Sequence, residues 1–414
     1  MAQAPYVVVG GGLAAAKAAE GLREEGFTGD VVVVTDEDHL PYERPPLSKD
    51  YLRGEVGRDT VFPLAESWYA EHEVEVRTGR TVTALDTDAH RLTLADGGAL
   101  DYSRLLLATG SSPRVPSVPG VDLDGVHVLR TLDQSDHLAT TLAAVASDGS
   151  GRLAVVGDGW IGLEVAASAR STGLDVTLIG RHAHPLERVL GPEMGEFYGL
   201  LHASHGVHLH RHAEVVAITG SDGRAAGVEM ADGTHVAADA VLVAVGAAPR
   251  TGLGDAAGLT VETGTGGLHT DQQLRTSAPD VLAAGDVASV PSPRYGRPLR
   301  IEHWATALHQ GTFAARSMLD ALDPGEVYDQ LPYFFSDQYD VGMEYLGFVD
   351  GPDGYDELVV SGSVEQRELV AFWLLGGRVQ AVMAVNTWDR MDRATELIGR
   401  NRPVDRAELE AFRD

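Results

Sequence analysis

Two glycine-rich motifs, GGGLAA at residues 10–15 and GDGWIG at residues 157–162, each follow a short apolar run and precede a helix-like segment. Continuous apolar runs of this kind favour parallel strands that are buried on both faces. A Gly-x-Gly-x-x-Gly/Ala pattern between strand and helix is typical of a loop that binds a dinucleotide pyrophosphate at the helix N-terminus. Two copies therefore predict two dinucleotide sites, and FAD with NAD(P) is the natural pair.

In the first motif each small residue has a separate role. Gly10 permits the turn, Gly12 lets a phosphate approach the backbone, and Ala15 allows close contact between helix and strand. Asp36 follows the next valine run, about 26 residues after Gly10, where an acid that binds the adenosine ribose is expected. Glu37 takes this role if the register shifts by one residue. A purely structural glycine turn is the alternative.

Length, composition and charge limit what the chain can be. Its 414 residues are too many for one hydrophobic core, so two or three domains are expected. Hydrophobic residues make up 44% and charged residues 22%, which is typical of a globular protein. The net charge of −29 argues against partners such as nucleic acid or an anionic membrane, because both would repel it.

The chain has no cysteine. This removes disulfides, thiolate nucleophiles, cysteine-ligated zinc and protein-held iron–sulfur clusters, so electron chemistry must use a bound cofactor. It also argues against disulfide or peroxide reduction on the same fold. No apolar run approaches the roughly 20 residues of a membrane span, and residues 1–5 lack a signal-like segment. We therefore expect a cytoplasmic location.

Stretches rich in proline and glycine indicate where the chain passes between domains. Residues 108–120 and 245–250 have this character, and the strand-like residues 281–284 suggest a return to the first domain. After about Pro324 the pattern changes to shorter apolar strands and a terminal helix. The expected strands are 358–361, 369–375 and 379–385.

These observations predict an α/β fold with two Rossmann-like dinucleotide-binding domains, of the glutathione-reductase-like kind, and a small C-terminal α+β domain. We expect the FAD-binding domain to be discontinuous, with the NAD(P)-binding domain inserted into it. The expected boundaries are 1–115 and 247–324 for the two parts of the FAD-binding domain, 116–246 for the NAD(P)-binding domain, and 325–414 for the C-terminal domain.

Five further motifs identify a family resemblance. They are LPYERPPLSK at 40–49, WIGLE at 160–164, AAGDV at 283–287, IEHW at 301–304 and FFSDQ at 334–338. In this order they resemble the oxygenase-coupled ferredoxin reductases, over about residues 6–386. The resemblance implies transfer of electrons from NAD(P)H through FAD to an iron–sulfur ferredoxin that serves a cytochrome P450 or a Rieske oxygenase. Rubredoxin reductases and apoptosis-inducing factor, an FAD-dependent interaction protein, share most of these motifs and remain alternatives.

The resemblance also implies residue roles. Arg44 and Arg130 would neutralise the FAD pyrophosphate, Asp286 would accept from the ribityl hydroxyls, Val82 would pack on adenine and Trp304 would lie near the isoalloxazine. The full set expected around FAD is Gly10, Gly12, Ala14, Ala15, Asp36, Glu37, Arg44, Lys49, Val82, Ala108, Gly110, Arg130, Gly285, Asp286 and Trp304. The set expected around NAD(P) is Gly157, Gly159, Ile161, Gly162, Arg181, His182, Arg188 and Gly246.

Lys49 and Glu164 are the expected catalytic pair. Glu164 lies two residues after Gly162 on the helix that follows the second motif, and a carboxylate there needs a partner. The resemblance places the pair beside flavin N5, where the lysine cation would stabilise negative charge and help position the nicotinamide. A structural ion pair is the alternative.

The nicotinamide cofactor is expected to be NADPH, NADH or both. The strand at 176–179 would normally end in an acid that binds ribose hydroxyls, but Gly180, Arg181 and His182 follow it. Arg181 can bind a 2′-phosphate, with support from His182 or Arg188. An ordinary surface arginine is the alternative.

Two other groups of residues invite a functional interpretation. Phe335 stands where the resembling reductases carry an aromatic residue near the flavin edge, which suggests partner docking, although a core phenylalanine is a serious alternative. Five histidines gather between residues 202 and 212. A helix end, a turn and a strand are expected there, so we expect solvated side chains and no metal site. The histidines are His202, His205, His208, His210 and His212.

Overall fold

The structure is a computed structural model that describes residues 4–147 and 151–412. By contacts the chain divides into two compact units. The first comprises Met1–Arg44, Arg58–Ser112 and Ala248–Pro332, and the second comprises Pro45–Gly57, Pro113–Ala247 and Tyr333–Asp414. Both units are therefore discontinuous in sequence. The separate domain boundaries expected above stay a prediction.

The first unit is built on a parallel sheet whose strand order is β19-β7-β1-β2-β3. Every residue of β1 and β2 is buried, as expected for valine runs covered on both faces. The strands are β1 (Tyr6–Val9), β2 (Val31–Val34), β3 (Val74–Arg77), β7 (Arg104–Leu107) and β19 (Val281–Ala283).

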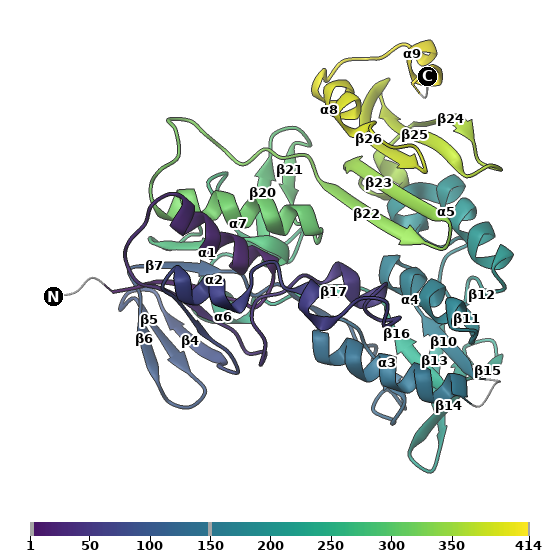
Figure 1. Cartoon of the computed structure of the whole chain (residues 1–414). Helices are drawn as coiled ribbons and strands as arrows, with labels where there is room; N and C mark the ends of the chain where they lie inside the picture. Colours follow the sequence, from purple (N-terminus) through teal and green to yellow (C-terminus); the bar gives the residue numbers. More distant parts are fainter. Residues whose placement is uncertain (1–3, 148–150, 413–414) are drawn as a thin grey trace. The chain divides into compact units, whose positions relative to one another are not determined.

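Helix α1 (Leu13–Glu24) lies beside α7 (Trp304–Met318) in this unit (Figure 1). The contact is close because glycines face alanines. A Cβ added to Gly311 would lie 2.5 Å from the backbone oxygen of Ala14, and one added to Gly21 would lie 2.9 Å from Cβ of Ala315. These small residues bring α7 and the segment before it close to the start of α1.

Smaller elements complete the first unit. They are the antiparallel sheet β4 (Val82–Asp86), β5 (Arg91–Leu94) and β6 (Ala99–Asp101), the sheet β18 (Leu268–His269), β20 (Ala288–Ser292) and β21 (Arg297–Leu299), and the helices α2 (Glu66–Glu71) and α6 (Gly252–Ala256). The short strands β8 (Ser111–Pro113) and β17 (Ala247–Pro249) contain two points where the chain passes between units.

The second unit contains another parallel sheet, in the order β12-β11-β10-β16-β9. Helix α4 begins one turn after β10, as the second glycine motif predicts. The elements are β9 (Val126–His127), α3 (Leu132–Ser147), β10 (Arg152–Val156), α4 (Trp160–Ser171), β11 (Asp175–Ile179), α5 (Glu187–Ser204), β12 (His208–His210) and β16 (Ala240–Val243), with an antiparallel sheet of β13 (Val215–Ser221), β14 (Arg224–Met230) and β15 (His235–Ala237).

The C-terminal part of the second unit is an antiparallel sheet in the order β22-β23-β26-β25-β24, followed by two helices (Figure 1). The expected strands at 358–361, 369–375 and 379–385 are confirmed, but β22 and β23 were not predicted. Their polar and glycine residues interrupt the apolar alternation. The elements are β22 (Tyr333–Gln338), β23 (Val341–Gly347), β24 (Glu357–Ser363), β25 (Glu368–Leu375), β26 (Arg378–Val385), α8 (Met391–Gly399) and α9 (Arg406–Glu410).

Buried side chains attach this C-terminal sheet to α5. Trp373 is fully buried and donates its indole N–H to the backbone oxygen of Leu190, at 3.0 Å. His202 is also fully buried, and its Nε2 lies 2.8 Å from Oε1 of Gln338 in β22. The two parallel sheets with their helices and the C-terminal antiparallel sheet with its helices confirm the fold class expected from the sequence.

The burial of His202 corrects one expectation. The helical period of α5 places it with Tyr198 and Leu201 on the face that is buried in the core. The expectation of a solvated side chain is therefore wrong for His202, whereas His208 and His212 are exposed. In the described part of the chain, no three histidine, aspartate or glutamate side chains gather so that they could hold a metal ion.

We predict that His202 makes the protein sensitive to acid. Burial lowers the pKa of His202 from 6.5 to about 4, so the unfolded chain binds a proton between these values and the folded chain does not. The free energy of unfolding should therefore fall as pH drops through this window, by about 2 kcal/mol between pH 7 and pH 5.

Urea unfolding at these two pH values tests the prediction. The His202→Gln variant should lose less stability on acidification than the parent protein. The matched control is His208→Gln, because His208 is exposed, and it should behave like the parent. An equal loss of stability in His202→Gln and the parent would contradict the assignment.

Candidate active site

The first glycine motif forms an open cradle at the start of α1. Gly10 has a φ of +153°, and a Cβ there would lie 2.1 Å from the backbone oxygen of Ala108, so only glycine fits. Gly12 is the N-cap of α1, and as a glycine it has no side chain to cap the helix start. A Cβ at Gly12 would meet guanidinium nitrogens of Arg44 at 3.9 and 4.0 Å. An uncapped helix start with an arginine at its rim fits a pyrophosphate.

Asp286 lies close to this cradle because its neighbour Gly285 packs against α1. A Cβ at Gly285 would be 3.3 Å from Cβ of Ala14, and the Gly285 amide donates to Oε1 of Gln310 at 2.8 Å. Asp286 is buried and accepts a hydrogen bond from the hydroxyl of Ser111 at 2.8 Å. The structure thus brings Asp286 and the first motif together.

The two acids after β2 have different partners. Asp36 pairs with Arg250, with a distance of 2.5 Å between Oδ2 and Nη2. Burial opposes ionisation of Asp36, but the hydrogen bond and charge of Arg250 leave the pKa of this carboxyl below its ordinary value. Glu37 instead accepts from Arg44, at 3.1 Å, and from the hydroxyl of Tyr42. Either acid therefore stands ready to accept hydrogen bonds.

The remaining residues expected around FAD in this unit lie at element ends. Ala15 is fully buried in α1, Ala108 and Gly110 follow β7, partly buried Val82 begins β4, and partly buried Trp304 begins α7. The sequence did not indicate Arg250 as a site residue. Its only signal was its position at the end of the second domain crossing.

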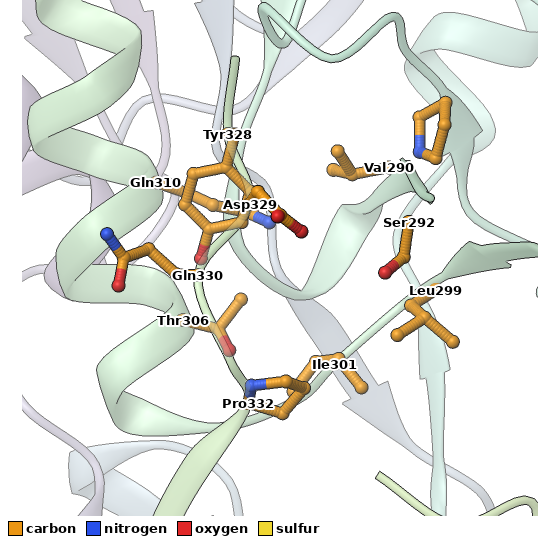
Figure 2. A pocket seen from close by; sticks show the side chains of 11 residues that line it. Val290, Ser292, Leu299, Ile301, Thr306, Gln310, Tyr328, Asp329, Gln330 and Pro332 are labelled. Atoms are coloured by element: carbon orange, nitrogen blue, oxygen red, sulfur yellow. The ribbon is translucent and has the colours of Figure 1, made fainter. Parts of the chain in front are cut away.

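The first unit contains a small cavity that is far too small to hold a dinucleotide. Its lining includes Gln310 and Thr306 of α7, Ser292 of β20 and Tyr328 (Figure 2). Its volume of about 30 Å³ has room for roughly one or two water molecules. We assign it no ligand.

The second glycine motif repeats the design of the first. Gly157 has a φ of +113°, and a Cβ there would lie 2.3 Å from the backbone oxygen of Ala244. Gly159 is the N-cap of α4, and a Cβ on it would meet no heavy atom of the described chain within 4 Å. A Cβ on Gly162 would lie 2.1 Å from the oxygen of Gly157, so helix and loop are in close contact. Ile161, 41% exposed, lies on the first turn.

The other residues expected around NAD(P) surround the carboxyl end of this sheet. Arg181 and Arg188 are exposed, and His182 is partly buried. Gly246 follows β16 with a φ of +111° and is exposed. Arg130, expected at the FAD pyrophosphate, belongs to this unit and is partly buried just before α3.

Lys49 and Glu164 meet in a buried ion pair within the second unit. The Nζ to Oε1 distance is 3.2 Å, and both side chains are less than a tenth exposed. The hydroxyls of Ser48 and Ser336 also donate to the Glu164 carboxylate, the latter at 2.7 Å. A buried carboxylate needs such donors, because water no longer solvates it.

A chain of hydrogen bonds extends from Glu164 to α5. Gln338 donates to the Ser336 hydroxyl at 3.1 Å, and Nε2 of His202 lies 2.8 Å from the Gln338 oxygen. Because that oxygen only accepts, Nε2 of His202 carries the hydrogen, and Nδ1 can accept from Tyr339 at 3.3 Å. Every donor in the chain points towards Glu164.

Strand β22 presents two different faces. Phe334 is buried against Trp160, whereas Phe335 on the opposite face is partly exposed, with Nζ of Lys49 5.5 Å from its ring centre. The sequence missed Ser48 and Ser336 as partners of Glu164, and Gln338 as the partner of Ser336. The two serines do lie inside the family-like motifs, each beside a residue that was singled out.

The chain belongs to the pyridine nucleotide-disulphide oxidoreductase family, which matches residues 4–311, and residues 333–412 match the reductase C-terminal family. Rhodocoxin reductase of Rhodococcus erythropolis is 37% identical over 92% of this chain and 86% of its own. The ferredoxin--NAD(+) reductase component of the anthranilate 1,2-dioxygenase system of Burkholderia cepacia is 36% identical over 99% of this chain and 97% of its own length.

A solved structure is similar over almost the whole chain. The putidaredoxin reductase in its covalent complex with putidaredoxin has a TM-score of 0.91 and 34% identity, and the match covers 99% of this chain and 96% of that one. Membership of the family implies FAD and NAD(H) as cofactors. None of the helices described here is long and apolar enough to cross a membrane.

We predict that Gly12→Ala weakens FAD binding without unfolding the protein. Gly12 has extended backbone angles that alanine adopts readily, but its Cβ would enter the space that a pyrophosphate needs. FAD affinity should fall roughly tenfold, which corresponds to about 1.4 kcal/mol.

The measurements are flavin absorbance per protein chain and the melting temperature of the apoprotein. Gly264→Ala is the matched control, because a Cβ there meets no described heavy atom within 4 Å and Gly264 lies outside the motif; it should retain FAD. Full FAD content in Gly12→Ala would show that the cradle does not hold the cofactor.

Proposed function

We propose that this chain is an FAD-dependent reductase that takes electrons from NAD(P)H and delivers them to an iron–sulfur ferredoxin serving a cytochrome P450 or a Rieske oxygenase. The observation that carries the proposal is the buried Lys49–Glu164 pair in a chain of this family that has no cysteine. Without a thiol pair, electrons must leave the bound cofactor directly for an external acceptor. A cytoplasmic location would suit both the electron donor and a ferredoxin.

The relatives support a ferredoxin as acceptor. One is named as a ferredoxin--NAD(+) reductase component of a dioxygenase system, and another was solved in complex with putidaredoxin. Both matches extend over the C-terminal sheet as well as the dinucleotide-binding parts. The proposed acceptor therefore rests on similarity over nearly the full length.

The chain's own residues would bind FAD as follows. The amides at the start of α1 would receive the pyrophosphate, and Arg44 and Arg130 would neutralise its charge. Arg250 would keep the Asp36 carboxylate charged and oriented, so that it accepts hydrogen bonds from the adenosine ribose. Glu37, the next residue, is the alternative acceptor. Val82, Asp286 and Trp304 would contact the adenine, the ribityl hydroxyls and the ring system, respectively. The small residues that would lie beside the cofactor are Ala14, Ala15, Ala108, Gly110 and Gly285.

When bound, FAD supplies the chemistry of accepting a hydride and returning electrons singly. The Lys49 ammonium would stabilise the negative charge that develops at the reacting ring. Glu164 would keep Lys49 in place, and the hydroxyls of Ser48 and Ser336 fix the carboxylate. A charge held in this way needs little rearrangement during the reaction.

We propose that the nicotinamide cofactor binds at the start of α4, on Gly157, Gly159 and Gly162, with Ile161 and Gly246 beside it. Exposed Arg181 could bind a 2′-phosphate, with His182 and Arg188 in support. These residues would allow use of NADPH in addition to NADH.

Stopped-flow mixing with NADH and NADPH tests the proposed function, followed by cytochrome c reduction with and without an added ferredoxin. We expect fast bleaching of the flavin and cytochrome c reduction that depends on the ferredoxin. Slow turnover with artificial acceptors and a long-lived reduced complex would instead indicate an interaction protein. Fast reduction of rubredoxin alone would indicate a rubredoxin reductase.

We predict that Phe335→Ala slows ferredoxin reduction by roughly tenfold, because a partly exposed aromatic side chain can bury apolar area against the partner. The rate of flavin reduction by NADH and the FAD content should remain nearly unchanged. Leu375→Ala removes another exposed apolar side chain and should affect neither half-reaction. If both half-reactions fall together in Phe335→Ala, the ring belongs to the core rather than to a docking surface.

A further inference from the structure

The end of β11 has no acidic side chain of its own, but an acid from the neighbouring loop fills that place. A Cβ built on Gly180, the first residue after β11, would lie 2.0 Å from Oδ2 and 2.5 Å from Cγ of Asp158. The Asp158 carboxylate therefore lies directly where a side chain at position 180 would begin. Only glycine at position 180 leaves room for it.

The backbone around Asp158 is bound to the end of β11 and to the residue before α5. The amide of Gly157 donates to the oxygen of Ile179 at 2.9 Å, and the amide of Leu186 donates to the oxygen of Asp158 at 3.0 Å. On its other side stands Gly159, the open N-cap of α4. Asp158 is thus placed between the strand end and the helix start by its backbone.

The pKa of Asp158 reflects its burial, its backbone hydrogen bond and two charged neighbours. Burial raises the pKa of Asp158 above its ordinary value; a backbone hydrogen bond and the charge of His182 act against this, and the charge of Glu187 adds to it. Asp158 is only partly buried, so a ligand can reach its carboxyl group. A carboxyl group in this position is able to accept hydrogen bonds from hydroxyl groups.

In Rossmann-type folds, an acid at the end of the second strand accepts hydrogen bonds from the adenosine ribose and repels a 2′-phosphate. We propose that Asp158, although it comes from the glycine loop, is this acid, and that it favours NADH over NADPH. The inference rests on the proposed nicotinamide site at α4. It names a residue that determines specificity there.

Asp158 and Arg181 would then act in opposite directions. The carboxylate repels the 2′-phosphate of NADPH, and the exposed guanidinium attracts it. Because Asp158 is held close to the helix start and Arg181 is free in solvent, we expect the acid to dominate. NADH would therefore be preferred, with residual use of NADPH.

Calorimetric titration of the FAD-loaded protein with NAD⁺ and NADP⁺ tests this inference. Asp158→Asn keeps the size of the side chain and removes its charge. We expect the ratio of NAD⁺ to NADP⁺ affinity to fall roughly tenfold or more, which corresponds to about 1.4 kcal/mol. Arg181→Glu, the matched variant, should change the ratio in the other direction.

A double variant guards against a purely structural explanation. Asp158→Gly combined with Gly180→Asp moves the acid to the strand end, and it should restore the preference for NAD⁺. An unchanged ratio in Asp158→Asn, or equal weakening of both nucleotides, would overturn the assignment and leave the proposed function intact. Failure of the parent protein to bind either nucleotide would overturn the proposed function as well.

Discussion

A carboxylate taken out of water must be surrounded by donors, and Glu164 shows how many elements this requirement ties together. Its partners come from the segment around Lys49, from β22 and, through Gln338 and His202, from α5. Removal of any one donor would leave a buried charge incompletely solvated. Glu164 therefore links three segments of the second unit that are far apart in sequence.

The two glycine loops are a second constraint of the same kind. At Gly10 and Gly157 the backbone approaches a neighbouring carbonyl so closely that a Cβ has no room. At the helix starts, a Cβ on Gly159 would meet no described heavy atom within 4 Å, and one on Gly12 would meet only Arg44, at 3.9 Å or more. Gly10 and Gly157 allow the sharp turn, and Gly12 and Gly159 keep the helix N-terminus accessible. The two loops therefore share one backbone design although their surrounding side chains differ.

The surrounding side chains give each loop its own charge. Around α1, Asp36 and Glu37 are each held by an arginine. Around α4, Asp158 lies against the strand end and Arg181 extends into solvent. Two copies of one backbone design thus present different groups, which is consistent with two different dinucleotides.

The sequence by itself determined the two strand–turn–helix units, because glycine spacing and apolar runs are local features that depend on adjacent residues. It also indicated Lys49 and Glu164 as candidates, since both stand in recognisable motifs. It could not show that Ser336 and His202 support Glu164, because residues so distant in sequence are brought together only by packing of the C-terminal sheet on α5. The same holds for Arg250 on Asp36 and for Asp158 beside Gly180: their contacts depend on how strand ends and loops are placed in space, which no local pattern encodes.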